Sequence, residues 1–310
     1  MVQGKRVVRL MGTIIELTIE HEAAESVLDE LVTRLKEYEH RFSANDPSSE
    51  LMQVNCQSGK SPVVVHPELY ELIKLGTAHS QAPGSQLNIA IGPLVQSWRI
   101  GFSDARVPSE AELNAKLALT DPSQIVLDDA AHSVFLTKPG MAIDLGSLAK
   151  GYIGDRLLAY LQSVGARSGL LNLGGNLLVF GPSSHPQGLW RIGIRDPQGD
   201  REEYRLILAT PATSVVTSGI YERQLVTGNH RYHHLIDRYT GHPLETDLAS
   251  LTILSQKSVD GEIWTTRLFG KEPDEILEIL AKTPGIEGIL IMKDRQVLTS
   301  AQVADHIIWQ

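Results

Sequence analysis

The segment 142–152 constrains the fold most, because its apolar start predicts a buried strand that turns directly into a helix. The apolar run Met141–Ile143 leads to Asp144, a turn follows at Gly146 and Ser147, and leucine and tyrosine then recur at roughly helical spacing. Ser147 is well placed to cap the helix, so the first helical amides would share one space with Asp144 and Lys150. These groups suit a phosphate–metal site, and the alternative is an ordinary strand–turn–helix with a solvated lysine.

Strand and helix patterns alternate along the rest of the chain, without repeats or low-complexity segments. Alternating apolar residues predict a first strand over 14–20, and helical spacing predicts an amphipathic helix over 22–41. Further helices are predicted over 67–80, 109–119, 147–164, 258–269 and 273–281. Further strands are predicted over 124–127, 133–137, 169–179, 190–195, 204–209, 214–217, 223–226, 233–236, 248–254, 288–292 and 296–299.

These patterns predict an α+β protein with mixed or antiparallel sheets and packed helices, because the strands often meet as hairpins. A doubly wound parallel sheet is disfavoured for the same reason. No break in composition marks a linker, so residues 1–310 are expected to form one domain of two merged lobes.

Charge and composition limit the classes of function. The formal net charge is −9, so general nucleic-acid binding is not expected, because it requires a basic surface. The single cysteine, Cys56, excludes an internal disulfide and a cysteine-rich metal site. No run approaches 18 apolar residues, and the N-terminal segment lacks a long apolar region and a cysteine for lipid attachment. We therefore expect no membrane span and a cytoplasmic location, or a periplasmic one if the natural chain begins earlier.

Four further segments carry polar residues that suit a binding site. Gly174 and Gly175 interrupt an apolar strand, which indicates either a bulge or a close approach of backbone to ligand. The strand end at 217–219 can offer hydroxyls and amides to a phosphate or a ring edge. His234 precedes an aspartate and a turn, although a lone histidine is also common as a structural residue. Asp260 starts a helix, where the dipole favours an acid with or without a metal.

Taken together, these motifs resemble the ApbE-like FAD:protein FMN transferase family, from near the start of the chain to about Gly270. Each motif is weak alone, but eight occur in the family's order. They are Met11-Gly12-Thr13; Phe42-Ser43 with Ser49-Glu50-Leu51 and Asn55; Gly92-Pro93-Leu94-Val95 with Trp98; Asp144-Leu145-Gly146 through Tyr152 with Asp155; Gly174-Gly175-Asn176; Thr217-Ser218-Gly219; His234-Leu235-Ile236-Asp237 with Thr240-Gly241 and Pro243; and Asp260 with Gly270.

The resemblance implies a T-shaped α+β fold that binds FAD and a divalent cation, usually Mg²⁺. Such enzymes split the FAD pyrophosphate, pass FMN to a Thr or Ser hydroxyl of an acceptor protein, and release AMP. The positions that match flavin-binding motifs are Met11, Asn45, Asn88, Asp144, Lys150, Gly174, Gly175, Thr217, Ser218, Gly219 and Ile236. By the same resemblance, His234 is the base, Lys150 stabilises charge on the pyrophosphate, and Ser147, Asp260 and Thr265 are candidate metal ligands.

The chain departs from the family's pattern at a few positions. Asn45 stands where a tyrosine commonly packs on the flavin, and Asn88 where an acid is frequent. Trp264 occupies the position of the metal-binding threonine, and Thr265 lies one residue away, about 100° around a helix. Arg238 replaces the usual proline. Two alternatives therefore stay open: an FAD-binding protein without transferase activity, and a Mg²⁺-dependent FAD pyrophosphatase that gives FMN and AMP.

Overall fold

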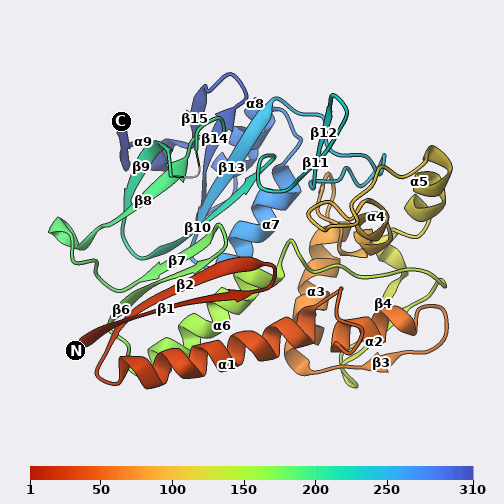
Figure 1. The fold of residues 1–310 in the computed structure, drawn as a ribbon, viewed down its shortest axis with the longest axis horizontal. Helices are drawn as coiled ribbons and strands as arrows, with labels where there is room; N and C mark the ends of the chain where they lie inside the picture. Colours follow the sequence, from red (N-terminus) through yellow and green to blue (C-terminus); the bar gives the residue numbers. More distant parts are fainter. Residues whose placement is uncertain (201, 310) are drawn as a thin grey trace.

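An eight-stranded sheet forms the centre of the computed structural model, which describes residues 1–200 and 202–309 (Figure 1). All its neighbouring strands run antiparallel. In spatial order the strands are β1 (Val2–Leu10), β2 (Thr13–His21), β6 (Ser168–Leu173), β7 (Asn176–Phe180), β10 (Thr213–Gly219), β13 (Leu248–Ser255), β14 (Ile286–Met292) and β15 (Val297–Thr299). Segments from both ends of the chain therefore meet in one sheet.

Smaller sheets flank this central one. They are β3 (Val63–Val64), β5 (Ser133–Leu136) and β4 (Ile125–Asp128); β16 (Ile307–Trp309), β9 (Tyr204–Thr210) and β8 (Trp190–Arg195); and the hairpin of β11 (Gln224–Thr227) and β12 (His230–His233). The helices are α1 (Ala24–Phe42), α2 (Glu50–Cys56), α3 (Pro67–Gln81), α4 (Gly92–Trp98), α5 (Glu110–Leu117), α6 (Ala149–Ser163), α7 (Ser258–Leu268), α8 (Pro273–Ala281) and α9 (Ala301–Ala304). The α+β architecture expected from the sequence is confirmed.

The two faces of the central sheet are covered by different partners. On one face, the apolar residues of β2 and β6 pack against α1 and α6, and α7 packs on β10 (Figure 1). On the other face, β8 and β9 contribute a second apolar layer against β10 and β14. Every residue of β13 is buried, because it lies between both coverings. In the described part of the chain, no helix is both long enough and apolar enough to cross a membrane.

Alternation in the sequence explains why β2 and α1 meet. Ile15, Leu17 and Ile19 point to one face of β2 and are wholly buried, as are Leu28 and Leu31 on α1. Burying each such side chain stabilises the fold by about 1.5–3 kcal/mol relative to leaving it exposed. This apolar layer anchors the helices that carry one side of the site.

The strand predicted over Met141–Ile143 is wrong, although the segment is buried and leads to Asp144. Its backbone pairs with no neighbouring strand, because the Asn55 side chain bonds both the amide and the carbonyl of Ile143. The prediction that Ser147 caps the following helix is also wrong. Helix α6 begins at Ala149, and Leu148 takes the capping position without a side-chain hydrogen bond.

Other differences follow from turns and edges. The strand predicted over 169–179 is two strands, β6 and β7, joined by a tight turn at Gly174 and Gly175. The strand predicted over 233–236 lies earlier, because β12 ends at His233. Strand β1 was not predicted, since it is an edge strand whose residues are mostly exposed and show little apolar alternation.

Candidate active site

Asp144 is held by its neighbours in a fixed position. Asn55 Oδ1 accepts from the Ile143 amide (2.7 Å), and Asn55 Nδ2 donates to the Ile143 carbonyl (3.0 Å). The Asp144 carboxylate accepts from the Gly146 amide (2.8 Å). Burial raises the pKa of Asp144, and the positive charge of Arg223 opposes that shift. A cation beside this carboxylate is therefore favoured.

Lys150 is bound to a buried polar network that joins α6 to α7 and β7. Its Nζ lies 3.0 Å from Glu262 Oε1, and Glu262 is only 3% exposed. The same carboxylate oxygen accepts from Asn176 Nδ2 (2.9 Å), and Asn176 Oδ1 accepts from the Ser258 hydroxyl (2.6 Å). The Ser214 hydroxyl donates in turn to Ser258 Oγ (3.0 Å). Because a buried charge needs such partners, the network both stabilises Glu262 and fixes the Lys150 ammonium.

His233 and His234 lie where β12 ends, and only one has a bound ring. His233 Nε2 lies 2.9 Å from the Leu244 carbonyl. Among the described residues neither ring nitrogen of His234 has a hydrogen-bond partner, and its Nδ1 is buried. Burial, and then the charge of Arg223, lowers the pKa of His234 to about 4, with a smaller contribution from Lys150. The His234 ring is therefore uncharged at neutral pH and able to accept a proton.

Two turns and one strand end lie beside these groups at the same end of the sheet. Gly174 and Gly175 both have positive φ, and a Cβ at Gly174 would collide with the Thr13 side chain, so their turn packs against the 11–13 turn. The Thr217 amide donates to the Gly175 carbonyl (3.2 Å). Ser218 and Gly219 follow on β10. The Gly175 turn and the end of β10 are thus joined directly.

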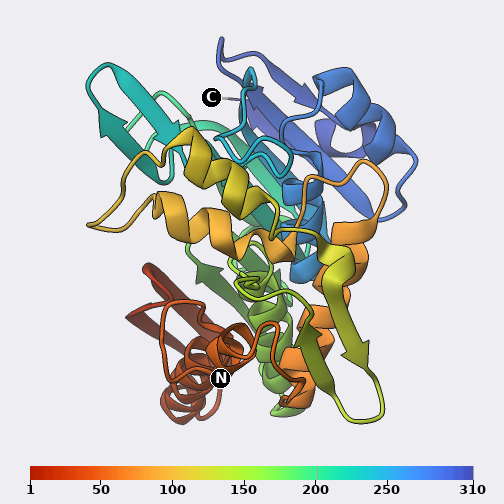
Figure 2. The same cartoon turned by 90° about the vertical axis from the view of Figure 1, so that its right-hand side faces the viewer.

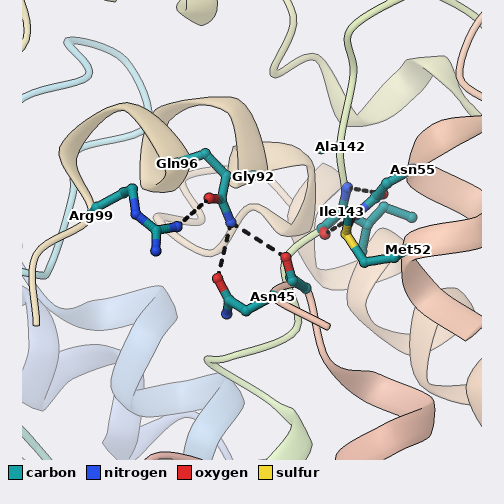
Figure 3. A pocket seen from close by; sticks show the side chains of 9 residues that line it. Asn45, Met52, Asn55, Gly92, Gln96, Arg99, Ala142 and Ile143 are labelled. Carbon is teal, nitrogen blue, oxygen red and sulfur yellow. Dashed lines mark hydrogen bonds between the residues drawn. The ribbon is translucent and has the colours of Figure 1, made fainter. Parts of the chain in front are cut away.

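A cavity of about 310 Å³ opens between α2, α4 and the segment before Asp144 (Figure 3). Its polar side is a row of three side chains. Gln96 donates to Asn45 Oδ1 (3.3 Å) and accepts from Arg99 Nη1 (2.8 Å). Ala142 and Ile143 line the cavity, so its inner wall leads directly to Asp144. A volume of this size fits a small aromatic ring system better than a whole dinucleotide.

The candidate metal ligands differ in their surroundings. Asp260 lies in the first turn of α7, partly buried, and burial raises its pKa while Lys257 and His79 oppose that shift. Thr265 is wholly buried, and its hydroxyl donates to the Glu262 carbonyl (3.0 Å). Over 1–200 and 202–309, no group of three or more His, Cys, Asp or Glu side chains is placed to hold a metal ion. Asp260 thus fits a cation, whereas the hydroxyl of Thr265 is already engaged.

The amides that begin α7 are occupied by the chain itself. The Asp155 carboxylate accepts from the amides of Ser258 (2.7 Å) and Val259 (3.0 Å). Burial raises the pKa of Asp155 to about 6. These two amides are therefore not available to a phosphate.

Two of the predicted flavin-binding residues have structural contacts instead of open polar groups. Asn88 is 4% exposed, accepts from the Ala90 amide (2.9 Å) and donates to the Thr120 carbonyl (2.7 Å). Ile236 is buried with Trp98 in the apolar cluster that joins α4 and α5 to the β11–β12 hairpin. Figure 2 shows the hairpin beside these two helices. Both side chains shape the region around the site.

Comparison with known proteins gives a consistent result. The profile of the ApbE family matches residues 11–290. The chain belongs to the ApbE family. An FAD:protein FMN transferase of Klebsiella pneumoniae is 39% identical over 94% of this chain and 90% of the relative. One of Treponema pallidum is 35% identical over 96% of this chain and 87% of the relative.

Solved structures of the ApbE family share the fold. The ApbE protein of Thermotoga maritima superposes with a TM-score of 0.90 at 25% identity, covering 98% of this chain and 99% of that one. The flavin transferase ApbE of Vibrio cholerae has a TM-score of 0.86 at 24% identity, with coverage of 98% and 99%. The ApbE-like fold predicted from the motifs is confirmed.

Sequence reasoning missed two charged residues of this ApbE family member. Glu262 lies four residues after Ser258, so both face the same side of α7, and that spacing was an available signal. Arg223 lies in an irregular segment between β10 and β11, where no periodicity marks the direction of a side chain. Its proximity to Asp144 and His234 is visible only in three dimensions.

Proposed function

We propose that this chain transfers FMN from FAD to a Thr or Ser hydroxyl of an acceptor protein and releases AMP, with Mg²⁺. It belongs to a family whose curated relatives are named FAD:protein FMN transferase, and it spans about nine-tenths of their length. The observation that carries the proposal is His234, an uncharged ring that has no hydrogen-bond partner within residues 1–200 and 202–309 and lies in the field of Lys150 and Arg223. A base beside cations suits transfer of a phosphate ester.

The flavin ring is proposed to occupy the cavity beside Asn45. The cavity is too small for all of FAD, so the pyrophosphate would lie beyond Ile143, next to Asp144. The amides of Asn45 and Gln96 would face polar atoms of the ring system. Because Asn45 offers no aromatic face, we expect weaker flavin fluorescence quenching than in a protein with a stacked tyrosine.

The acceptor hydroxyl is proposed to attack the FMN phosphorus while His234 takes its proton. A new P–O bond forms to the acceptor, and the bond from that phosphorus to the bridging oxygen breaks. AMP leaves with that oxygen and its electron pair. Lys150, oriented by Glu262, would stabilise negative charge on the phosphate oxygens.

Mg²⁺ is proposed to bind at Asp260 with an oxygen of Ser147, since Mg²⁺ often uses one or two protein oxygens together with phosphates and water. Burial without a hydrogen-bond donor among the described residues makes the Asp260 carboxylate receptive to a cation. When bound, the ion supplies positive charge to the pyrophosphate. Thr265 would contribute only if its hydroxyl left the Glu262 carbonyl.

The test is an HPLC assay with FAD, Mg²⁺ and a candidate Thr-containing acceptor protein, following FMN, AMP and flavinylated acceptor together. Stoichiometric AMP and flavinylated acceptor are the expected result. Formation of FMN and AMP without labelled acceptor would instead establish a pyrophosphatase. Tight FAD binding without turnover over a panel of acceptors would establish a binding protein.

A further inference from the structure

Arg223 lies between elements that form the candidate site. It precedes β11, and its carbonyl accepts a hydrogen bond from the amide of His234 (3.2 Å). A Cβ added at Gly101 would lie 2.8 Å from Arg223 Cδ, and one added at Gly12 would lie 3.5 Å from its Nη2. The side chain therefore extends past the segment after α4 toward the turn between β1 and β2. The absence of a side chain at Gly101 leaves room for it.

The guanidinium of Arg223 has no ion-pair partner in the part of the chain that the structure describes. The adjacent carboxylate, Glu222, pairs with Arg195 instead (3.7 Å). Arg223 is exposed, and its charge acts on both Asp144 and His234. An arginine that lies beside a base and a carboxylate of the site, without an ion pair, is available to an anion from solution.

Lys150 differs from Arg223 in this respect. Its ammonium is paired with the buried Glu262 at 3.0 Å, so much of its charge is already balanced. A pyrophosphate brings negative charge that this neutral pair cannot fully offset. Arg223 offers a further positive charge beside that of Mg²⁺, and its planar group can bond two phosphate oxygens at once.

We propose that Arg223 is a catalytic anion-binding residue whose guanidinium contacts the pyrophosphate of the dinucleotide and holds the phosphate of the departing nucleoside monophosphate. This inference rests on the proposed function. As the P–O–P bridge breaks, the bridging oxygen keeps the electron pair and leaves as part of the monophosphate. The guanidinium of Arg223 stabilises that negative charge, while the proton of the acceptor hydroxyl goes to His234.

The experiment compares Arg223→Gln and Arg223→Lys with Arg231→Gln. Arg231 is a matched control, because it is exposed on β12 of the same hairpin and pairs across it with Val226. Dissociation constants for FAD and riboflavin are measured by calorimetry at two salt concentrations, and unfolding temperatures check the fold. Transfer of FMN is then measured in single turnovers with saturating FAD and Mg²⁺.

For Arg223→Gln we expect FAD binding weakened about 10- to 100-fold, the range for losing hydrogen bonds to a charged group, and unchanged riboflavin binding. The salt dependence of FAD binding should shrink, and the transfer rate should fall at saturating FAD. Arg223→Lys should keep the charge but lose part of the rate, and Arg231→Gln should match wild type.

Unchanged FAD affinity and unchanged rate in a folded Arg223→Gln variant would overturn the inference and leave the proposed function intact. If wild-type protein bound FAD no more tightly than riboflavin, the proposed function and this anion site would both fall. If wild type bound FAD but did not transfer FMN, the proposed function alone would fail. The affinity comparison would then still decide whether Arg223 binds the pyrophosphate.

Discussion

His233 and His234 are neighbours in the chain, and His234 is the one whose ring has no hydrogen-bond partner among the described residues. We expect His234→Ala to lower the transfer rate by roughly 10²–10⁴ with little change in FAD affinity. His233→Ala should mainly reduce stability, because it removes the contact of its ring with the Leu244 carbonyl. Single-turnover rates with one acceptor distinguish the two. A normal rate in His234→Ala together with an inactive His233→Ala would move the base to His233.

The pH dependence of kcat/KM follows from the low pKa of His234. With a pKa of about 4, the ring stays in the base form well below pH 6.5, so kcat/KM should change little between pH 7.5 and 5.5. A loss of about tenfold over that range would show an ordinary histidine. The low pKa of His234 also makes stability depend on pH. Its contribution of about 3 kcal/mol to the free energy of unfolding is present above pH 6.5 and is lost as pH falls toward 4. Chemical denaturation of wild type and of His234→Ala over this pH range measures that contribution to stability.

Asp260 offers a carboxylate for a cation without supporting α7 through a hydrogen bond of its own among the described residues. We expect Asp260→Ala to abolish Mg²⁺-dependent turnover while stability changes by only about 0.3–1 kcal/mol, as for an acid near a helix start. Activity and thermal unfolding with and without Mg²⁺ measure both effects. Full activity in the variant would show that Asp260 serves the helix dipole alone.

At this scale, the sequence could single out Asp144, Lys150 and His234 as candidates, because each stands in a motif with a recognisable neighbour. It could not show that Glu262 binds Lys150, because the two residues are distant in the chain and meet only when α6 packs on α7. Nor could it show that Thr265 faces inward, because a shift of one residue on a helix is decided by packing.

Helices α6 and α7 approach each other closely at one glycine. A Cβ at Gly151 would lie 2.5 Å from the Ser258 carbonyl oxygen, whereas one at Gly154 would lie 3.3 Å from the end of the Leu173 side chain. Gly151→Ala should therefore push the helices apart, destabilise the fold by about 1–3 kcal/mol and slow transfer by moving Glu262 relative to Lys150. Gly154→Ala should be near neutral, since better helix propensity offsets a small adjustment. The free energy of unfolding in denaturant and the turnover rate are measured for both variants. Equal losses in Gly151→Ala and Gly154→Ala would contradict this reasoning.

Long periodic elements such as α1 and α3 were predictable, because their apolar stripe alone determines the buried face. The segment before Asp144 was not. Its alternating residues are buried as in a strand, but the Asn55 side chain satisfies its backbone. Local pattern predicts burial there, and it cannot predict which group provides the hydrogen bonds.

Segments from both ends of the chain meet in the central sheet, and we propose that residues 1–310 unfold as a single cooperative unit. Saturating FAD with Mg²⁺ should raise the midpoint temperature of thermal unfolding, since a ligand at 100 times its dissociation constant adds about 2.7 kcal/mol to the free energy of unfolding. Riboflavin at the same concentration should raise it less, because it lacks the pyrophosphate that Lys150 and Arg223 would contact. Calorimetric scans test both statements. Two separate transitions would contradict the single unit, and equal shifts would contradict the phosphate contacts.

Sequence could predict the antiparallel character of the sheets, because many successive strands lie close together in the chain. It could not predict the strand order. Strand β10 pairs with both β7 and β13, and β2 pairs with β6, across intervening segments that carry no mark of their partner. Only the packing of the apolar faces selects these neighbours.

The pairing of β2 with β6 has a consequence for synthesis of the chain. Glu20 lies opposite Ser168, so the edge of β2 that pairs with β6 has no partner until about 150 more residues have been synthesised. At ribosomal rates this takes on the order of ten seconds. During that interval the β1–β2 hairpin and α1 can form, but β2 carries an unpaired edge to which another nascent chain could add. The vulnerable period of this protein therefore precedes its release from the ribosome.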